Sequence, residues 1–448
     1  MLLLLIFVFG VWLWDNHLGQ PAGHQPDAWE FAMRKADRDL RIAEGTEKLP
    51  AWLRPVLGID TLEQTLATTE ASFTQLARLR HHHNEDPATR ALNDEGAYAL
   101  AVIIAVRNDG NPATGPFNAH GLPGPPPPGP IMSRVISSQE NWWDLAYLRG
   151  LDFPGTEEAS QLVDARTQHL TNNAIKARGA VLALALSGLV FIPGTLIAFV
   201  RAGKSKRRRP VNYSHHWHIG FGLGVFLLAY LASVGFSITF NAALQQAAPE
   251  ATDGVAKPLM SMPLFITLDG LTRFLPALIA LGLLFRRSRH AVSRLGIAGP
   301  LDAKLILGSF AILQIIEFGL RMTLDRSGAP NPTGGLDASE AGLWGLAFGV
   351  VSACIAAPIA EEILYRGVLF RSLANRINLT SAVLISSVVF ALVHFYPISS
   401  LITVFSVGVT CALCYASSRT LLTAIALHAL YNAAIKLPEW IVYHAPLS

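Results

Sequence analysis

The chain has 448 residues, of which 51% are hydrophobic and only 15% are charged, with a formal net charge of +3. A soluble globular protein carries about 25% charged residues, so this composition argues against a soluble protein and predicts one that crosses a membrane several times. The small net charge gives no reason to expect a nucleic acid as partner. The three cysteines (Cys354, Cys411 and Cys414) all fall in apolar stretches, and no disulfide framework is expected.

The N-terminal third of the chain differs from the rest. Residues 1–14 form an apolar run that spans about 21 Å as a helix, against roughly 30 Å for a bilayer core, and we expect a short membrane anchor or a signal-like segment. Residues 15–178 are hydrophilic with amphipathic stretches, and we expect a mainly helical extramembrane domain that a Gly/Pro-rich linker at 109–130 interrupts. Residues 97–106 within it are apolar but too short to span a bilayer.

From residue 179 to the C-terminus the chain alternates between apolar segments and polar loops. We expect an all-α, polytopic membrane protein with about eight C-terminal transmembrane helices. These lie at residues 180–200, 217–240, 264–285, 305–320, 343–370, 381–395, 400–416 and 421–442. Every second loop is rich in Arg and Lys, and the positive-inside rule therefore places these loops in the cytoplasm of a bacterial cell. Residues 15–178 would then lie on the extracytoplasmic face of its inner membrane.

Ionisable and amide side chains interrupt three of the last spans. Six residues make up this candidate site: Glu361, Glu362, Arg366, His394, His428 and Asn432. Charged groups at membrane depth are costly, usually face inward in pairs, and mark a functional site.

Helical spacing suggests different roles for the two glutamates. Glu362 and Arg366 are four residues apart, so the arginine can neutralise this carboxylate. Glu361 points about 100° away and is left as a candidate general base. A structural ion network between helices is the alternative. An unbroken helix would leave Glu361 and His394 at different depths, and a break at Pro358 is one way to bring them together.

Two mechanisms fit these residue types. In the first, Glu361 and His394 activate a water, while His428 and Asn432 stabilise the oxyanion that forms at a peptide carbonyl. In the second, Glu361, His394 and His428 bind Zn²⁺ or another divalent metal, and the metal-bound water is the nucleophile. The residue types alone do not separate the two.

The order of the motifs resembles a known family. The motifs are Glu361-Glu362-x-x-x-Arg366, Phe390-x-x-x-His394, Phe405-x-x-Gly408 and His428-x-x-x-Asn432. They resemble the CPBP intramembrane proteases, which include CAAX prenyl proteases and bacterial abortive-infection proteins. The resemblance covers a core at about residues 343–436 and, more loosely, the spans from residue 180. It does not extend to residues 15–178.

The resemblance implies an intramembrane endopeptidase that acts on a membrane-associated protein or peptide. By this similarity Glu361 is the catalytic base with His394 as its partner. His428 and Asn432 stabilise the oxyanion or act as ligands, and the remaining Glu and Arg of the first motif support them. A prenylated CAAX substrate is not expected, because the large outer domain gives no reason for one. A non-catalytic immunity or scaffold protein of the same fold, and a proton-coupled transporter, are the alternatives.

Overall fold

The computed structural model contains only helices in the part of the chain that it describes, which confirms the predicted all-α class. The described residues are 28–79, 87–108, 126–137, 139–204, 219–247, 262–285, 295–297, 299–323, 347, 349–394, 396 and 398–444. The predicted anchor at 1–14 and most of the linker at 109–130 lie outside them, so both remain predictions.

The chain divides into two compact units, each described here by itself. Unit 1 comprises residues 1–19, 183–320 and 338–437, and unit 2 comprises residues 20–182, 321–337 and 438–448. The sequence-based boundary at residue 178 lies close to this division.

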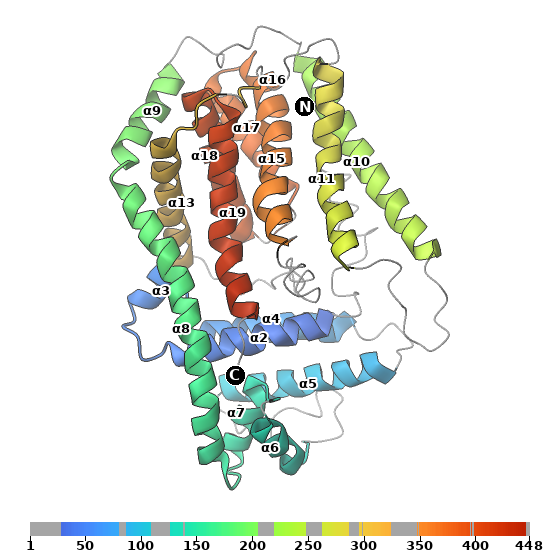
Figure 1. Ribbon diagram of the computed structural model, residues 1–448, viewed down its shortest axis with the longest axis vertical. Helices are drawn as coiled ribbons and strands as arrows, with labels where there is room; N and C mark the ends of the chain where they lie inside the picture. Colours follow the sequence, from blue (N-terminus) through green and yellow to red (C-terminus); the bar gives the residue numbers. More distant parts are fainter. Residues whose placement is uncertain are drawn as a thin grey trace. The chain divides into compact units, whose positions relative to one another are not determined.

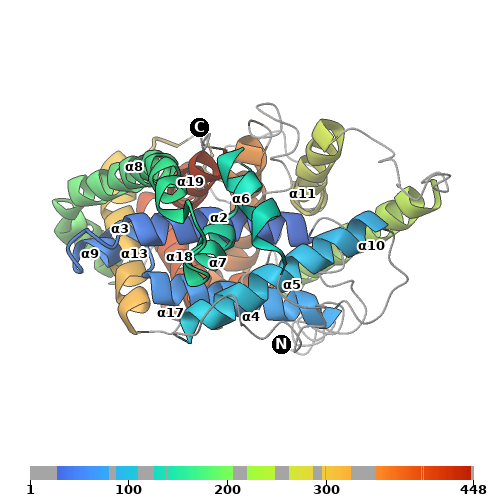
Figure 2. The ribbon, with the colours of Figure 1, turned by 90° about the horizontal axis from the view of Figure 1, so that it is seen from below.

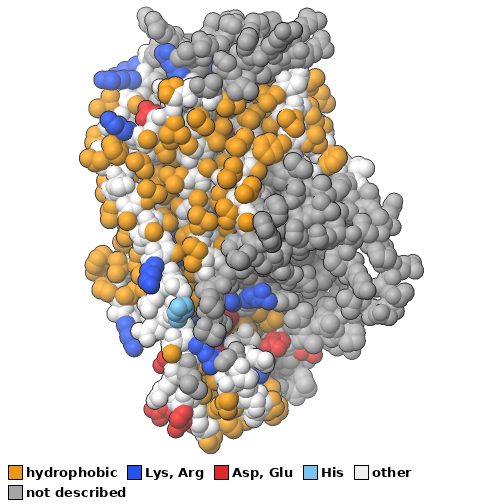
Figure 3. Space-filling model, viewed as in Figure 1, with side chains coloured by type: hydrophobic (Ala, Val, Ile, Leu, Met, Phe, Trp, Pro, Cys, Tyr) orange, Lys and Arg blue, Asp and Glu red, His pale blue; other side chains and the backbone are white. Residues whose placement is uncertain are grey.

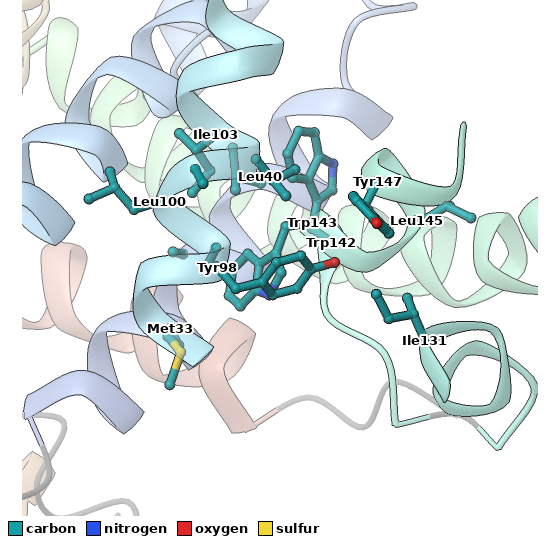
Figure 4. Packing of buried hydrophobic residues seen from close by; sticks show 14 of the residues in the cluster. Met33, Leu40, Tyr98, Leu100, Ile103, Ile131, Trp142, Trp143, Leu145 and Tyr147 are labelled. Atoms are coloured by element: carbon teal, nitrogen blue, oxygen red, sulfur yellow. The ribbon is translucent and has the colours of Figure 1, made fainter. Parts of the chain in front are cut away.

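Unit 2 packs a set of amphipathic helices around a core of its own (Figures 2 and 4). Its helices are α2 (Ala28–Gly45), α3 (Leu53–Leu57), α4 (Leu62–Leu79), α5 (Pro87–Arg107), α6 (Pro128–Ile136), α7 (Trp142–Gly150) and most of α8 (Thr156–Leu189). The apolar run at 97–106 is the C-terminal half of α5, and Leu100 within it is 0% exposed. Trp143 of α7 is also 0% exposed and meets the Phe73 ring at 6.1 Å. An apolar run too short for a bilayer is therefore the centre of a helical core.

A buried carboxylate lies in the first turn of α7. Asp144 is 0% exposed and accepts hydrogen bonds from Asn141 N at 3.0 Å, Arg134 Nη2 at 2.7 Å and the Tyr98 hydroxyl at 3.2 Å. Together with the Asn141 side chain it forms a capping box. Burial raises the pKa of Asp144 from 3.8 to about 6, although Arg134 and the Asn141 hydrogen bond act in the opposite direction.

Unit 1 contains the helices that are long and apolar enough to cross a membrane (Figure 1). Its longer helices are α9 (Ile192–Lys204), α10 (Ile219–Ala247), α11 (Met262–Phe285), α17 (Leu379–Leu392), α18 (Ile398–Ser418) and most of α13 (Ala303–Thr323) and α19 (Leu421–His444). In the described residues the candidate spans are Ile219–Phe236, Ala303–Thr323, Ser400–Ser418 and Leu421–Val442. Hydrophobic side chains gather on the face seen in Figure 3. The exposed hydrophobic residues of α9 and α13 include Leu196, Ile197, Val200, Ile315 and Phe318.

The predicted number of about eight spans is not confirmed. Among the described residues four helices qualify, or five if the bent pair formed by α8 and α9 is one broken span. The expected span at 180–200 is broken where α8 ends at Leu189 and α9 begins at Ile192, with a bend of 63°. Pro193 at the start of α9 lacks the N–H that would continue α8, which accounts for the break. Two further apolar stretches, Phe274–Leu284 and Leu379–Leu392, are shorter than a full span.

The expected span at 343–370 is a helix that alternates between π-helical and α-helical segments. It runs through the π-helix η7 (Ser352–Ala356), α15 (Ala357–Glu362), the π-helix η8 (Ile363–Phe370) and α16 (Arg371–Ala374). Pro358 lies in the first turn of α15. In a regular α-helix the proline ring would clash with the carbonyl of the residue four positions earlier. The wider turn of η7 relieves that clash. Both glutamates of the candidate site therefore lie on one α-helical turn between two π-helical segments.

Candidate active site

The buried centre of the site is the Glu362–Arg366 pair. Glu362 is 0% exposed and Arg366 is 1% exposed. Arg366 Nη1 donates to Glu362 Oε1 at 2.7 Å, and Nη2 donates to the carbonyl of Gly408 on α18 at 3.1 Å. The arginine thus offsets the charge of Glu362, as the spacing predicts, and also ties η8 to α18.

His428 of α19 lies between the two glutamates. Its Nδ1 is 2.9 Å from Glu362 Oε1, and its Nε2 is 3.8 Å from Glu361 Oε2. The His428 side chain is 5% exposed, whereas the Glu361 side chain is 28% exposed. Glu362 therefore orients the ring of His428, while Glu361 is the carboxylate that a water or a substrate can reach.

The Phe390 ring of α17 contacts three side chains of the site. Arg366 Cζ lies 4.3 Å from its centroid, and the His394 and His428 rings lie at 4.8 and 5.8 Å in edge-to-face geometry. Gly408 makes this packing possible, because a Cβ there would lie 3.3 Å from the Phe390 ring and 3.0 Å from the Cβ of Ser387. An aromatic platform thus unites motifs that are far apart in the sequence.

Backbone carbonyls orient the last two predicted site residues. His394 Nδ1 is 2.6 Å from the carbonyl of Phe390, a contact that leaves Nε2 for a proton or a substrate. Glu361 interacts electrostatically with His394. Asn432 Nδ2 donates to the carbonyl of Ala353 in η7 at 2.9 Å. All six predicted site residues are therefore brought into one connected group, but Asn432 uses one of its two N–H groups to hold η7.

The three residues proposed as metal ligands do not form a metal site in this geometry. Within the described part of the chain, no three His, Cys, Asp or Glu side chains come together closely enough to hold a metal ion. The Nδ1 contacts of His394 and His428 are of the kind that orient metal-binding histidines, but Glu361, His394 and His428 do not converge. Metal binding remains a prediction, and no step below is drawn through a metal.

The sequence analysis did not single out two tyrosines that lie near the site. Tyr365 of η8 lies with its ring 5.0 Å from Phe390, and a side-chain hydrogen bond joins it to Tyr230 of α10. A signal for Tyr365 exists, because it lies four residues after Glu361 and so shares its helix face. Tyr230 has no such signal, because a single tyrosine in an apolar helix is interpreted as an ordinary core residue.

Buried, paired charges and two histidines on apolar helices are the kind of arrangement that marks a functional site at membrane depth. Residues 343–434 match the family model described as Type II CAAX prenyl endopeptidase Rce1-like. The match contains all of the predicted motifs and confirms the predicted family for this segment. With the apolar helices, it identifies an integral membrane protein with a domain of a membrane protease family. Comparisons with curated proteins and with solved structures find no match.

Proposed function

We propose that the protein is an intramembrane endopeptidase that hydrolyses a peptide bond of a membrane-associated protein or peptide. One observation carries the proposal: the partly exposed carboxylate of Glu361 faces His428 Nε2 beside the fully buried Glu362–Arg366 pair. The buried pair has its charges offset and can be structural. Glu361 has neither that burial nor a short ion pair with an arginine among the contacts described here, and it lies in the segment that matches a protease family.

In the proposed reaction Glu361, with His394 beside it, accepts a proton from water as the water oxygen attacks the peptide carbonyl. The negative charge that develops on the carbonyl oxygen is stabilised by His428 and by the second N–H of Asn432. The proton on Glu361 then passes to the amide nitrogen as the C–N bond breaks, which leaves a carboxylic acid and an amine. Glu362 and Arg366 keep the His428 ring in place throughout.

The setting of the reaction follows from the charge pattern of the chain. The basic loops support a cytoplasmic position for that side of the bundle in a bacterial inner membrane, with residues 15–178 on the outer face. The bilayer and a protein or peptide substrate are the partners. The description of the matched family names a CAAX prenyl endopeptidase. The experiment below tests whether this protein requires a prenyl group on its substrate.

The test is to reconstitute the wild type, Glu361→Gln and the surface control Glu63→Gln in liposomes with membrane proteins from cells that lack the protein. New N-termini are then identified by mass spectrometry. We expect products with the wild type and Glu63→Gln that are absent with Glu361→Gln. A farnesylated peptide with a CAAX end and its unprenylated twin are added as probes of substrate class. Identical termini with and without Glu361 would contradict a protease and favour a scaffold or a transporter.

A further inference from the structure

Two arginines of unit 2 meet at Gly58, the residue that ends α3. Gly58 has a φ of 70°, in the left-handed region, and Arg321 Nη1 donates to its carbonyl at 2.8 Å. A Cβ at residue 58 would lie 3.2 Å from Nη1 of both Arg178 and Arg321. The two guanidinium groups therefore approach each other over a position without a side chain, where glycine provides space as well as the required backbone conformation.

The two cations differ in their counter-charges. Asp60 Oδ1 lies 3.7 Å from Arg321 Nη1. Arg178 is half-buried on α8, and within the described ranges of the chain it makes no hydrogen bond or ion pair with a carboxylate. A partly buried cation is costly without an anion beside it. The charge of Arg178 is therefore suited to an anion from outside the chain.

Membrane spans end at the position of this arginine pair. Arg321 lies in the last turn of α13, which is a candidate span. Val442, the last residue of the candidate span in α19, shares one apolar core with Leu57 and Ile59, the neighbours of Gly58. A chain that leaves the bilayer at the end of a span passes through the headgroup layer, so Gly58 lies at the level of the lipid headgroups.

The other end of α3 has an exposed tryptophan. Trp52 precedes the first residue of α3, and its side chain is 68% exposed. An indole ring favours the boundary between headgroups and acyl chains, because it combines an apolar body with one N–H donor. Lys48, four residues earlier, is also exposed. An aromatic ring with basic neighbours is typical of an element that lies on a membrane surface.

We propose that Arg178 binds the phosphate group of a membrane phospholipid, with the adjacent charge of Arg321 favouring the anion and Trp52 in the headgroup layer beside it. A guanidinium can donate two parallel hydrogen bonds to phosphate oxygens, which makes arginine the side chain best suited to this ligand. The bound lipid then connects α3, α8 and the end of α13 to the bilayer. This site is separate from the proposed protease function and does not depend on it.

The experiment measures lipid binding to the detergent-purified full chain by native mass spectrometry. The protein is titrated with a palmitoyl-oleoyl phosphatidylglycerol, and with the diacylglycerol that has the same chains and no phosphate. Arg178→Gln is compared with Lys176→Gln, which removes the same charge from an exposed position of α8. Residues two positions apart point to different sides of a helix, so Lys176 is a matched control.

We expect Arg178→Gln to weaken the affinity for phosphatidylglycerol about 10- to 100-fold, the range for loss of hydrogen bonds to a charged group. Lys176→Gln should change it by less than roughly twofold, and the diacylglycerol should bind weakly to all three proteins. Millimolar inorganic phosphate should not displace the lipid. Equal affinity of the wild type and Arg178→Gln overturns the inference, and displacement by inorganic phosphate alone overturns the choice of a lipid.

A second measurement does not depend on the folding of an arginine variant. The wild type and Trp52→Phe are reconstituted in nanodiscs whose lipids carry bromine near the start of the acyl chains. The difference between the two emission spectra belongs to Trp52. We expect the brominated lipids to quench this difference at least roughly twofold relative to unbrominated lipids. An unquenched difference would place α3 in water, away from any lipid phosphate, and would overturn the inference.

Discussion

The guanidinium carbon of Arg366 lies 4.3 Å from the centroid of the Phe390 ring. Arg366 also donates to Glu362 and to the Gly408 carbonyl, so one buried cation connects η8, α17 and α18. Charge, hydrogen bonding and ring packing all converge on this side chain. The shape of the site therefore depends on Arg366.

Replacing Arg366 should destabilise the protein more than an ordinary loss of charge. Arg366→Met leaves Glu362 buried without its counter-charge, and we expect a loss of about 3–5 kcal/mol in the free energy of unfolding. Arg366→Lys keeps the charge but cannot reach Glu362 and Gly408 with one planar fork, so it should recover only part of that loss. Denaturant unfolding in detergent measures both variants. Lys304→Met, at an exposed position of α13, is the control and should differ little from the wild type.

The two adjacent glutamates should respond differently to the same substitution. Glu361→Gln should reduce cleavage about 10²- to 10⁴-fold, the range for loss of a general base, and leave the thermal midpoint nearly unchanged. Glu362→Gln should lower both, because Arg366 and His428 then lose the buried charge that they contact. Cleavage rates and thermal unfolding of both variants are the measurements. Equal loss of stability in the two variants would mean that Glu361 is structural.

The sequence predicts the contacts within one helix of this site better than the contacts between helices. The i,i+4 spacing correctly pairs Glu362 with Arg366, because a helix fixes that distance locally. The contact of His428 with Glu362 depends on how α19 packs on α15, and no local pattern encodes it. An analysis that assumes one helical period also does not predict the π-helical turns around Pro358.

Two of the expected spans differ from the observed helices for a similar reason. Hydropathy marks residues 180–200 as one span but does not reveal the 63° bend between α8 and α9. It also counts residues 381–395 as a span, although the apolar helix there, Leu379–Leu392, is shorter than a bilayer core. Composition thus gives the class of the protein, while the path of each helix depends on packing.

A side chain at Gly408 should destabilise the protein. A Cβ there would lie 3.0 Å from the Cβ of Ser387 and 3.3 Å from the Phe390 ring. Gly408→Ala should therefore push α17 away from α18, at a cost of about 1–3 kcal/mol, and disturb the ring that supports both histidines. The control is Gly282→Ala on α11, where a new Cβ meets nothing within 4 Å. Since alanine favours a helix over glycine, this variant should be neutral or slightly stabilised. Thermal unfolding and cleavage are compared for both.

Asp144 should make unit 2 less stable as the pH rises. Its pKa is raised from 3.8 to about 6, chiefly by burial. Its stabilising contribution is therefore complete below pH 3.8 and is lost as the pH rises through about 6. We expect the difference in unfolding free energy between wild type and Asp144→Asn to fall by about 3 kcal/mol over this range. Tryptophan fluorescence of Trp142 and Trp143 reports the transition during denaturant unfolding. Asp152→Asn, at an exposed position, should follow the wild type, and a flat difference for Asp144→Asn would contradict the prediction.

Removal of divalent metal should leave the proposed cleavage intact. Glu361, His394 and His428 do not converge within the described residues, and Glu361 with its neighbours can activate water without a metal. Metal content is measured in detergent-purified wild type, Glu361→Ala, His394→Ala and His428→Ala, together with wild-type cleavage after dialysis against a chelator. We expect the same trace level of metal in all four proteins and unchanged cleavage after dialysis. One zinc per chain that disappears in both histidine variants, with activity restored by added zinc, would instead make His394 and His428 ligands. The bundle would then have to close around the metal to bring Glu361 within coordination distance.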